Sequence, residues 1–203
     1  MLRKFLMAGV ACLLLAAGNA SAEVVPYTVE PHADGRFELI VEKTRLMSGK
    51  QHLFLFPEYA GQLRFDVEAP EKSSMELRIK TATVVCKDDW VSEKDLIKIE
   101  DEARDKMMQA DKHPELVFRS KAIRALGDGA YEVAGDLSIR GAAKPVTVRV
   151  TMQPSGDSSL RFEGESTINM RDWGLKPPSA ALGTVGTNEM MQVRFQLLAR
   201  RDG

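Results

Sequence analysis

The stretch Gly61-Gln62-Leu63-Arg64-Phe65-Asp66-Val67-Glu68-Ala69 alternates apolar and polar residues almost one by one. In an extended chain, successive side chains point to opposite faces, so Leu63, Phe65 and Val67 are predicted on one face and the charged residues between them on the other. This pattern is typical of an antiparallel strand that covers a core with one face and meets water with the other. The stretch therefore predicts a half-buried strand.

The same period of two recurs along most of the chain. It is found in the segments 75–80, 131–140, 146–152, 160–168 and 191–197. Sequences rich in Pro, Gly and Asp separate these segments, at 69–71, 127–129, 140–141 and 154–157. Short linkers of this kind join neighbouring antiparallel strands. We expect eight to ten strands in one all-β sheet system, which either closes as a barrel or packs as a sandwich.

One segment departs from this rhythm and is predicted to be helical. Between residues 90 and 110, apolar residues recur at steps of three and four, and Ser92 with Asp95 resembles a capping box. The pair His113-Pro114 ends the pattern. A helical insertion at about 90–112 is compatible both with closing one end of a barrel and with lying on its outside.

The first 22 residues have the layout of a secretory signal peptide. Arg3 and Lys4 precede an apolar run over 5–17, and the small residues Ala20-Ser21-Ala22 follow it. The run is shorter than the roughly 20 residues that a membrane-spanning helix needs. We therefore expect cleavage after Ala22, export to the periplasm and one β domain over 23–203.

Composition and spacing argue against several function classes. The chain has 28 basic and 29 acidic residues, which does not favour nucleic-acid binding. His32, His52 and His113 lie in different segments and lack a metal-ligand spacing, and Cys86 would be left without a disulfide partner after export. No nucleophile and base can be paired by motif. The sequence thus predicts no catalytic residue, no metal and no cofactor, and hence a protein that is not an enzyme.

The apolar faces of the strands must be hidden from water. A barrel of about eight strands has an interior just wide enough to be filled by side chains or to hold one small ligand. The inward positions are mainly Leu, Val, Ile and Met, which would suit either a close-packed core or a cavity. The pattern alone leaves both open.

Specific residues carry a resemblance to a known family. The segment YEVAGDLSIRGAAKPV (131–146) resembles the hairpin signature of the YceI-like family of secreted polyisoprenoid-binding proteins, and HPELVFRS (113–120) resembles the strand opening before it. Near the ends, YTVEP (27–31) is similar to the first strand of that family, and DWGLKP (172–177) to a late loop of its divergent members. The resemblance spans nearly the whole chain after the leader.

The resemblance implies a lipocalin-like barrel of about eight strands whose hydrophobic tunnel takes up an isoprenoid amphiphile in the periplasm. Under that hypothesis Trp173 and Lys176 are placed at the mouth, where an indole would cover the tail and an ammonium would meet a polar head. The predicted tunnel lining consists of Phe37, Leu39, Phe65, Leu77, Ile79, Phe118, Leu137, Val148, Phe162 and Phe195.

Three functions follow in order of preference. The first is a periplasmic carrier that encloses a long isoprenoid lipid, either a quinone or a prenyl phosphate, as a monomer or homodimer with transient contact to a membrane. The second is a non-enzymatic accessory module with a filled barrel, whose charged helix docks on a membrane-associated complex. A hydrolase ranks last, because no nucleophile and base can be named.

Overall fold

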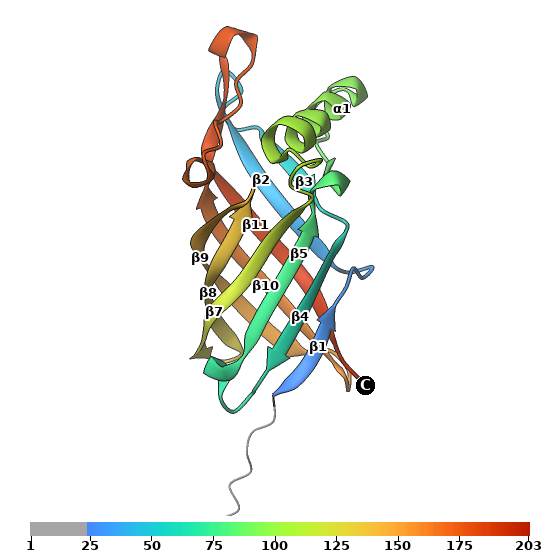
Figure 1. The fold of residues 1–203 in the computed structure, drawn as a ribbon. Helices are drawn as coiled ribbons and strands as arrows, with labels where there is room; N and C mark the ends of the chain where they lie inside the picture. Colours follow the sequence, from blue (N-terminus) through green and yellow to red (C-terminus); the bar gives the residue numbers. More distant parts are fainter. Residues whose placement is uncertain (1–23) are drawn as a thin grey trace, which may run out of the picture.

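A computed structural model describes residues 24–203, and the predicted signal peptide over 1–22 lies outside the described residues. Eight strands form a closed ring in which all neighbours are antiparallel (Figure 1). In ring order these are β1 (Val25–Val29), β4 (Tyr59–Phe65), β5 (Ser74–Lys80), β7 (Glu115–Gly127), β8 (Ala130–Ile139), β9 (Ala142–Pro154), β10 (Ser159–Asn169) and β11 (Val185–Arg201). Strand β11 pairs with β1 and closes the ring, so the prediction of an antiparallel, about eight-stranded barrel is confirmed.

Strand β11 is long enough to serve two neighbours on the same side. Its last residues pair with β1, whereas the stretch from Val185 to Gln196 pairs with β2 (Arg36–Arg45). Next to β2 follow β3 (Gln51–Leu55) and β6 (Val85–Cys86), so residues 24–203 hold eleven strands rather than eight to ten. The three additional strands extend the wall at one end of the barrel, where β2 and β3 form one side of a chamber.

The expected alternation holds within β4 and fails directly after it. Leu63 and Phe65 are buried, but Val67 is 68 % exposed and Asp66 is fully buried. The strand ends at Phe65, and the Asp66 Oδ1 atom accepts hydrogen bonds from the backbone N–H groups of Glu68 at 3.0 Å and Ala69 at 2.9 Å. The prediction that Val67 faces the core is therefore wrong, because the chain has already entered a turn that Asp66 stabilises.

The hairpin that carries the family resemblance has a two-residue turn. Ile139 pairs with Ala142, and Arg140 and Gly141 between them have φ of 51° and 78°. Positive φ at both central residues is the type I′ geometry, whose twist matches that of the flanking strands. The turn therefore fixes the register of β8 against β9.

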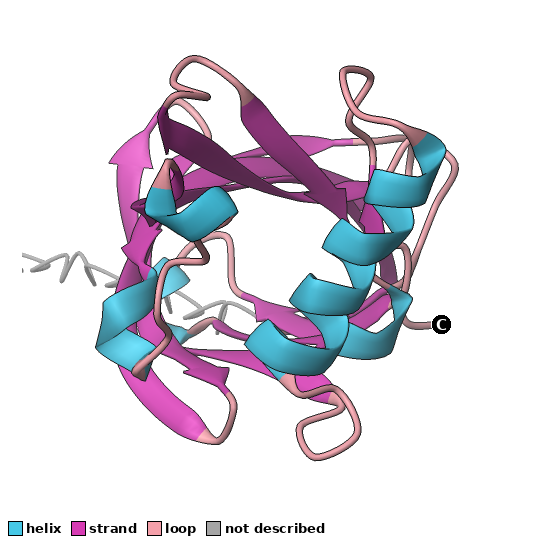
Figure 2. Cartoon of the chain, turned by 90° about the horizontal axis from the view of Figure 1, so that it is seen from above, coloured by secondary structure: helices cyan, strands magenta, loops and turns pink. Residues whose placement is uncertain are grey.

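The helical insertion lies at one end of the barrel. Helix α1 (Glu93–Asp101) continues into a π-helical segment, η3 (Glu102–Met108), and Ser92 Oγ accepts a hydrogen bond from the Asp95 backbone N–H at the start of α1. Seen along the barrel, this segment covers one side of the opening (Figure 2). Four 3₁₀ turns complete the elements, η1 (Pro70–Lys72), η2 (Thr81–Thr83), η4 (Met170–Trp173) and η5 (Ala181–Gly183).

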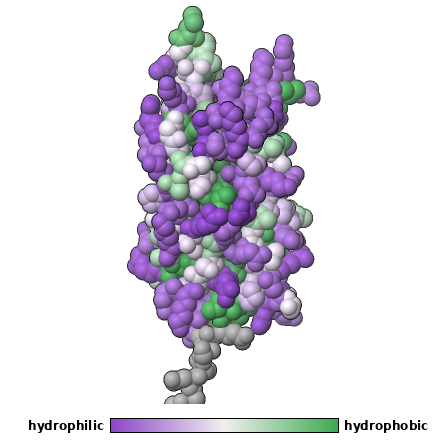
Figure 3. Space-filling view, in the orientation of Figure 1, coloured by the Kyte–Doolittle hydropathy of each residue, from purple (hydrophilic) through white to green (hydrophobic). Residues whose placement is uncertain are grey.

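The outer surface is predominantly polar on the face shown in Figure 3. Outward side chains of neighbouring strands form ion pairs across the sheet, such as Arg78 with Glu115 at 2.8 Å and Arg119 with Glu76 at 2.9 Å. Among residues 24–203, no helix combines the length and the apolar composition needed to cross a membrane.

Asp66 is expected to stabilise the fold measurably. The substitution Asp66→Ala removes an acceptor for two backbone N–H groups and should lower the free energy of unfolding by about 1 to 3 kcal/mol. Urea denaturation monitored by circular dichroism measures this loss.

Val67→Ala is the matched control for Asp66→Ala. The Val67 side chain is largely exposed, so its truncation should change the free energy of unfolding by less than about 0.5 kcal/mol. If Val67→Ala proved the more damaging of the two changes, the described turn would be wrong and the simple alternation right.

Candidate functional site

Two adjoining cavities lie inside the molecule. The first, which we name the barrel cavity, lies within the ring of strands and has a volume of about 130 Å³. The second, the upper chamber, lies between the upper barrel wall, β2, β3 and the helical segment, and has a volume of about 500 Å³. The larger volume is within the range of small-molecule sites.

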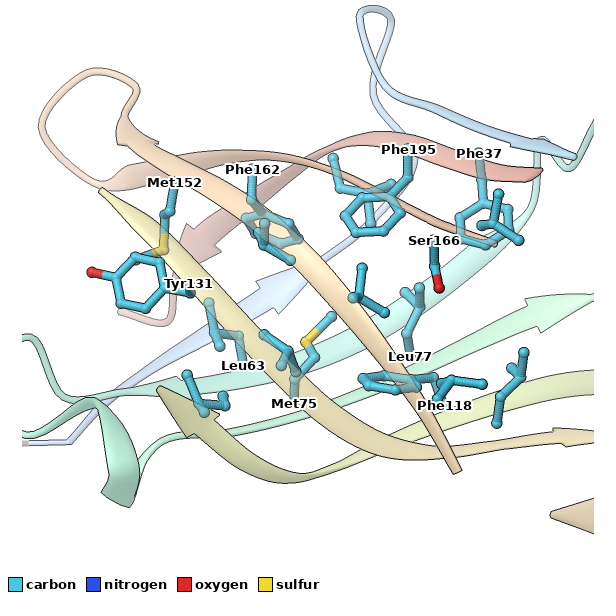
Figure 4. Close-up of a pocket in the computed structure, with 18 of the residues that line it drawn as sticks. Phe37, Leu63, Met75, Leu77, Phe118, Tyr131, Met152, Phe162, Ser166 and Phe195 are labelled. Atoms are coloured by element: carbon cyan, nitrogen blue, oxygen red, sulfur yellow. The ribbon is translucent and has the colours of Figure 1, made fainter. Parts of the chain in front are cut away.

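The barrel cavity is apolar over almost its whole surface. Its lining residues come from β2, β4, β5, β7, β8, β9, β10 and β11, and Ser166 and Tyr131 are the ones that carry a hydroxyl group (Figure 4). At one end, the rings of Phe65 and Tyr131 pack edge to face with centroids 5.7 Å apart. A pair of this geometry is favourable for aromatic side chains. The cavity therefore offers dispersion contacts and hardly any hydrogen bonds.

Two glycines help to keep the space open. A Cβ atom at Gly135 would lie 2.7 Å from ring carbons of Phe118, and one at Gly164 would lie 2.9 Å from the Phe195 Cε2 atom. The two rings thus pack on the glycine backbone of the neighbouring strand. The side chain of any other residue at Gly135 or Gly164 would take up the place of the ring. Rings packed against the wall in this way leave the middle of the barrel less filled.

The two cavities meet at a shared set of side chains. Phe37 belongs to this set, and its ring stacks on that of Phe195 with centroids 6.1 Å apart and planes 4° apart. The residues that line both spaces are Phe37, Ile79, Leu137, Ile168 and Val193. All five are apolar, so the boundary between the barrel cavity and the upper chamber is formed by apolar side chains.

The upper chamber combines an apolar wall with charged groups at its helical side. Two of the lining cations are paired with lining acids, Lys98 with Asp95 at 2.8 Å and Lys106 with Glu102 at 2.6 Å. Lys43 lines the opposite wall, and burial lowers the pKa of its ammonium group although the charge of Asp88 acts in the other direction. The chamber is therefore the part of the site that can receive a polar group.

A buried polar cluster lies beside this chamber. The His52 Nδ1 atom is 2.5 Å from Asp88 Oδ2, and Asp88 Oδ1 accepts a hydrogen bond from the Leu53 backbone N–H at 2.9 Å. Cys86 belongs to the same cluster, and burial raises the pKa of its thiol to about 12. Sequence reasoning missed this cluster, because the pairing of β3 with β6 brings together residues that are more than 30 positions apart.

The structure places ten of the twelve predicted site residues in the lining. These are Phe37, Leu39, Phe65, Leu77, Ile79, Phe118, Leu137, Val148, Phe162 and Phe195. The other two, Trp173 and Lys176, line neither cavity. Trp173 is buried and its indole N–H donates to the Leu137 carbonyl oxygen at 3.0 Å, whereas Lys176 is exposed. The 3₁₀ turn η4 thus uses the indole to fasten the loop to β8.

Other lining residues were not predicted. Val41 continues the alternation of Phe37 and Leu39 along β2, so the period of two could have found it. Ile99, Ala103 and Met107 line the chamber from the helical segment, and their spacing of four residues predicted a shared face. The sequence could not predict that this face covers the upper chamber, because the position of the helix relative to the barrel depends on the tertiary structure.

Comparison with known proteins agrees with this architecture. A curated UPF0312 protein from Pseudomonas savastanoi is 28% identical over 195 residues, which cover 91% of this chain and 94% of that protein. The solved structure of BcnA from Burkholderia cenocepacia has a TM-score of 0.61 and 22% identity, covering 80% of this chain and 95% of BcnA.

A second solved structure is similar over more of the chain. A polyisoprenoid binding domain from Saccharophagus degradans has a TM-score of 0.63 and 10% identity, with 89% of this chain and all of that domain covered. The family model described as the YceI-like domain matches residues 27–199, from within β1 nearly to the end of β11. This chain therefore belongs to the YceI-like family.

Proposed function

We propose that this protein is a non-enzymatic periplasmic carrier that encloses a long isoprenoid lipid, a quinone or a prenyl phosphate. The observation that carries this proposal is the pair of adjoining cavities, the apolar barrel cavity and the upper chamber, with five apolar residues that line both. The barrel cavity is small and apolar, whereas the upper chamber is larger and partly charged. This combination suits an amphiphile with a hydrocarbon tail.

The energetics of burial favour such a ligand. Each methylene transferred from water into an apolar site contributes about 0.8 kcal/mol, so one five-carbon isoprene unit contributes roughly 3 to 4 kcal/mol before entropy is subtracted. The barrel cavity would take the tail, because its lining offers few hydrogen-bond partners. The head would lie in the upper chamber near Lys43 and His52.

Two further observations support the proposal. The Saccharophagus degradans domain that shares the fold is a polyisoprenoid binding domain. Residues 1–22 have the composition of a secretory leader, which supports export to the periplasm. An exported carrier could keep in solution a tail that water alone would not hold.

The interior weighs against the accessory hypothesis, which assumes a filled barrel. It also gives little support to covalent catalysis. Cys86, the one cysteine after the leader, is buried, and its raised pKa keeps the thiol protonated and poorly nucleophilic near neutral pH. The side chains that surround the cavities are suited to holding a ligand by contact area.

A bound lipid should be recoverable from the protein as it is exported by its cell. Organic extraction of the mature protein, purified without detergent, followed by mass spectrometry is expected to yield about one isoprenoid lipid per chain. A protein that is folded yet lipid-free, and that also takes up no added isoprenoid, would contradict the carrier function.

Blocking the barrel cavity should abolish uptake of a long tail. Leu77 lines that cavity and is only 6 % exposed, so Leu77→Trp fills the space and is expected to weaken isoprenoid binding at least tenfold. Binding is measured with geranylgeraniol as the probe, and thermal unfolding checks that the variant is folded.

Arg78→Trp is the matched control, because it introduces the same side chain at the next position on the outer face of β5, where the Arg78 side chain is 45 % exposed. It should bind geranylgeraniol like the unmodified protein. Equal binding by a folded Leu77→Trp variant would refute the assignment of the barrel cavity to the tail.

A further inference from the structure

One histidine, His52, lines the upper chamber, and its imidazole is oriented by contacts with Asp88 and Trp90. His52 lines the chamber and its side chain is 11 % exposed, whereas the side chain of Asp88 behind it is completely buried. Trp90 stacks on the imidazole with centroids 5.4 Å apart and planes 25° apart. The ring is thus held by a carboxylate at one edge and an indole on one face, at a residue that lines the chamber.

Hydrogen bonding decides which nitrogen carries the proton. Asp88 accepts the Leu53 N–H through Oδ1 and meets His52 Nδ1 through Oδ2. An ionised carboxylate can only accept hydrogen bonds, so Nδ1 is the nitrogen that donates. In an imidazole whose one proton is on Nδ1, the Nε2 atom is an acceptor.

This acceptor is available to a ligand. Within residues 24–203, the buried side-chain N and O atoms without a hydrogen-bond partner are Tyr59 Oη and Asp66 Oδ2, and His52 Nε2 is not among them. Its protein-side hydrogen bond is made through Nδ1. Among the described residues Nε2 therefore has no protein partner and keeps some accessible surface, and because His52 lines the chamber, a hydroxyl group of a ligand there could donate to it.

The charges of the chamber discriminate between head groups. Lys98 and Lys106 are already paired with Asp95 and Glu102, as described above. Among the described residues, Lys43 has no ion-pair partner within 4.0 Å, and its ammonium group donates a hydrogen bond to Thr187 Oγ1 at 3.5 Å. A single half-buried lysine, with two carboxylates across the chamber, offers poor compensation for the several charges of a diphosphate.

A metal ion is a weaker explanation of the same cluster. The ligand atoms of His52, Cys86 and Asp88 lie within 4.8 Å of one another. Two ligands of a tetrahedral zinc ion lie about 3.3 Å apart, given metal–ligand distances of about 2.0 Å. The separation of 2.5 Å between Nδ1 and Oδ2 is too short for two ligands of one zinc ion and fits a short hydrogen bond.

We propose that His52, oriented by Asp88, recognises the head of the ligand by accepting a hydrogen bond from its hydroxyl group at Nε2. The ligand class is then an isoprenoid alcohol or an isoprenoid phenol, including the reduced form of a quinone, rather than a prenyl diphosphate. This inference rests on the proposed carrier function and narrows it to one head-group chemistry.

The test compares three probes that share one tail, namely geranylgeraniol, its methyl ether and geranylgeranyl diphosphate. Affinities are measured on the mature protein by displacement of the fluorescent probe N-phenyl-1-naphthylamine. The alcohol should bind about three- to tenfold more tightly than the ether, which cannot donate, and more tightly than the diphosphate.

Two substitutions should remove this preference in different ways. His52→Phe keeps an aromatic ring but has no acceptor, so the affinity for the alcohol should fall to that for the ether. In Asp88→Asn the Leu53 N–H retains the amide oxygen, and the amide nitrogen then faces His52 and donates to Nδ1. Nε2 becomes a donor in that variant, so the affinity for the ether should rise toward that for the alcohol.

Phe162→Leu is the matched control, since Phe162 lines the barrel cavity far from the head. It should weaken all three probes alike and leave their ratios unchanged. Equal binding of alcohol and ether by the unmodified protein, or tighter binding of the diphosphate, would overturn the head-group assignment alone. Failure of every probe to bind would instead refute the carrier function.

Discussion

The rest of the structure depends on the pairing of β11 with two different strands, β1 and β2. Its end bonds to β1 and closes the ring, and its earlier part bonds to β2 and extends the wall. Closure satisfies the backbone groups of an otherwise open sheet edge and turns every apolar face toward one axis. The extension of the wall forms the upper chamber beyond the end of the barrel. The fold therefore contains two adjoining cavities instead of one.

The cavity inside the barrel follows from the placement of large and small side chains on the inner face of the eight strands. Leu, Val, Ile and Met supply most of the inward positions, and Phe118 and Phe195 lie over Gly135 and Gly164. A ring that packs on glycine backbone leaves room at the axis that a ring opposite a larger residue would occupy.

The helical insertion and the extended wall give the two cavities different chemistry. Near Phe65 and Tyr131 the barrel cavity is lined by aromatic rings, whereas the upper chamber near α1 has charged groups and the imidazole of His52. An amphiphile would therefore bind in one orientation. Orientation matters for a carrier, because the end that leaves first decides which part of the ligand a membrane or a partner meets.

The sequence by itself determined the antiparallel strands, the helix over part of 90–112, the family and ten of the lining residues, because each depends on local periodicity or on a contiguous motif. Only the tertiary structure decided where β2, β3 and β6 lie, that Asp66 rather than Val67 is buried, and that Trp173 fastens a loop to β8. It alone placed His52 beside Asp88. The physical reason is that a period of two tells which side chains share a face, whereas contacts between distant strands depend on how the ring closes.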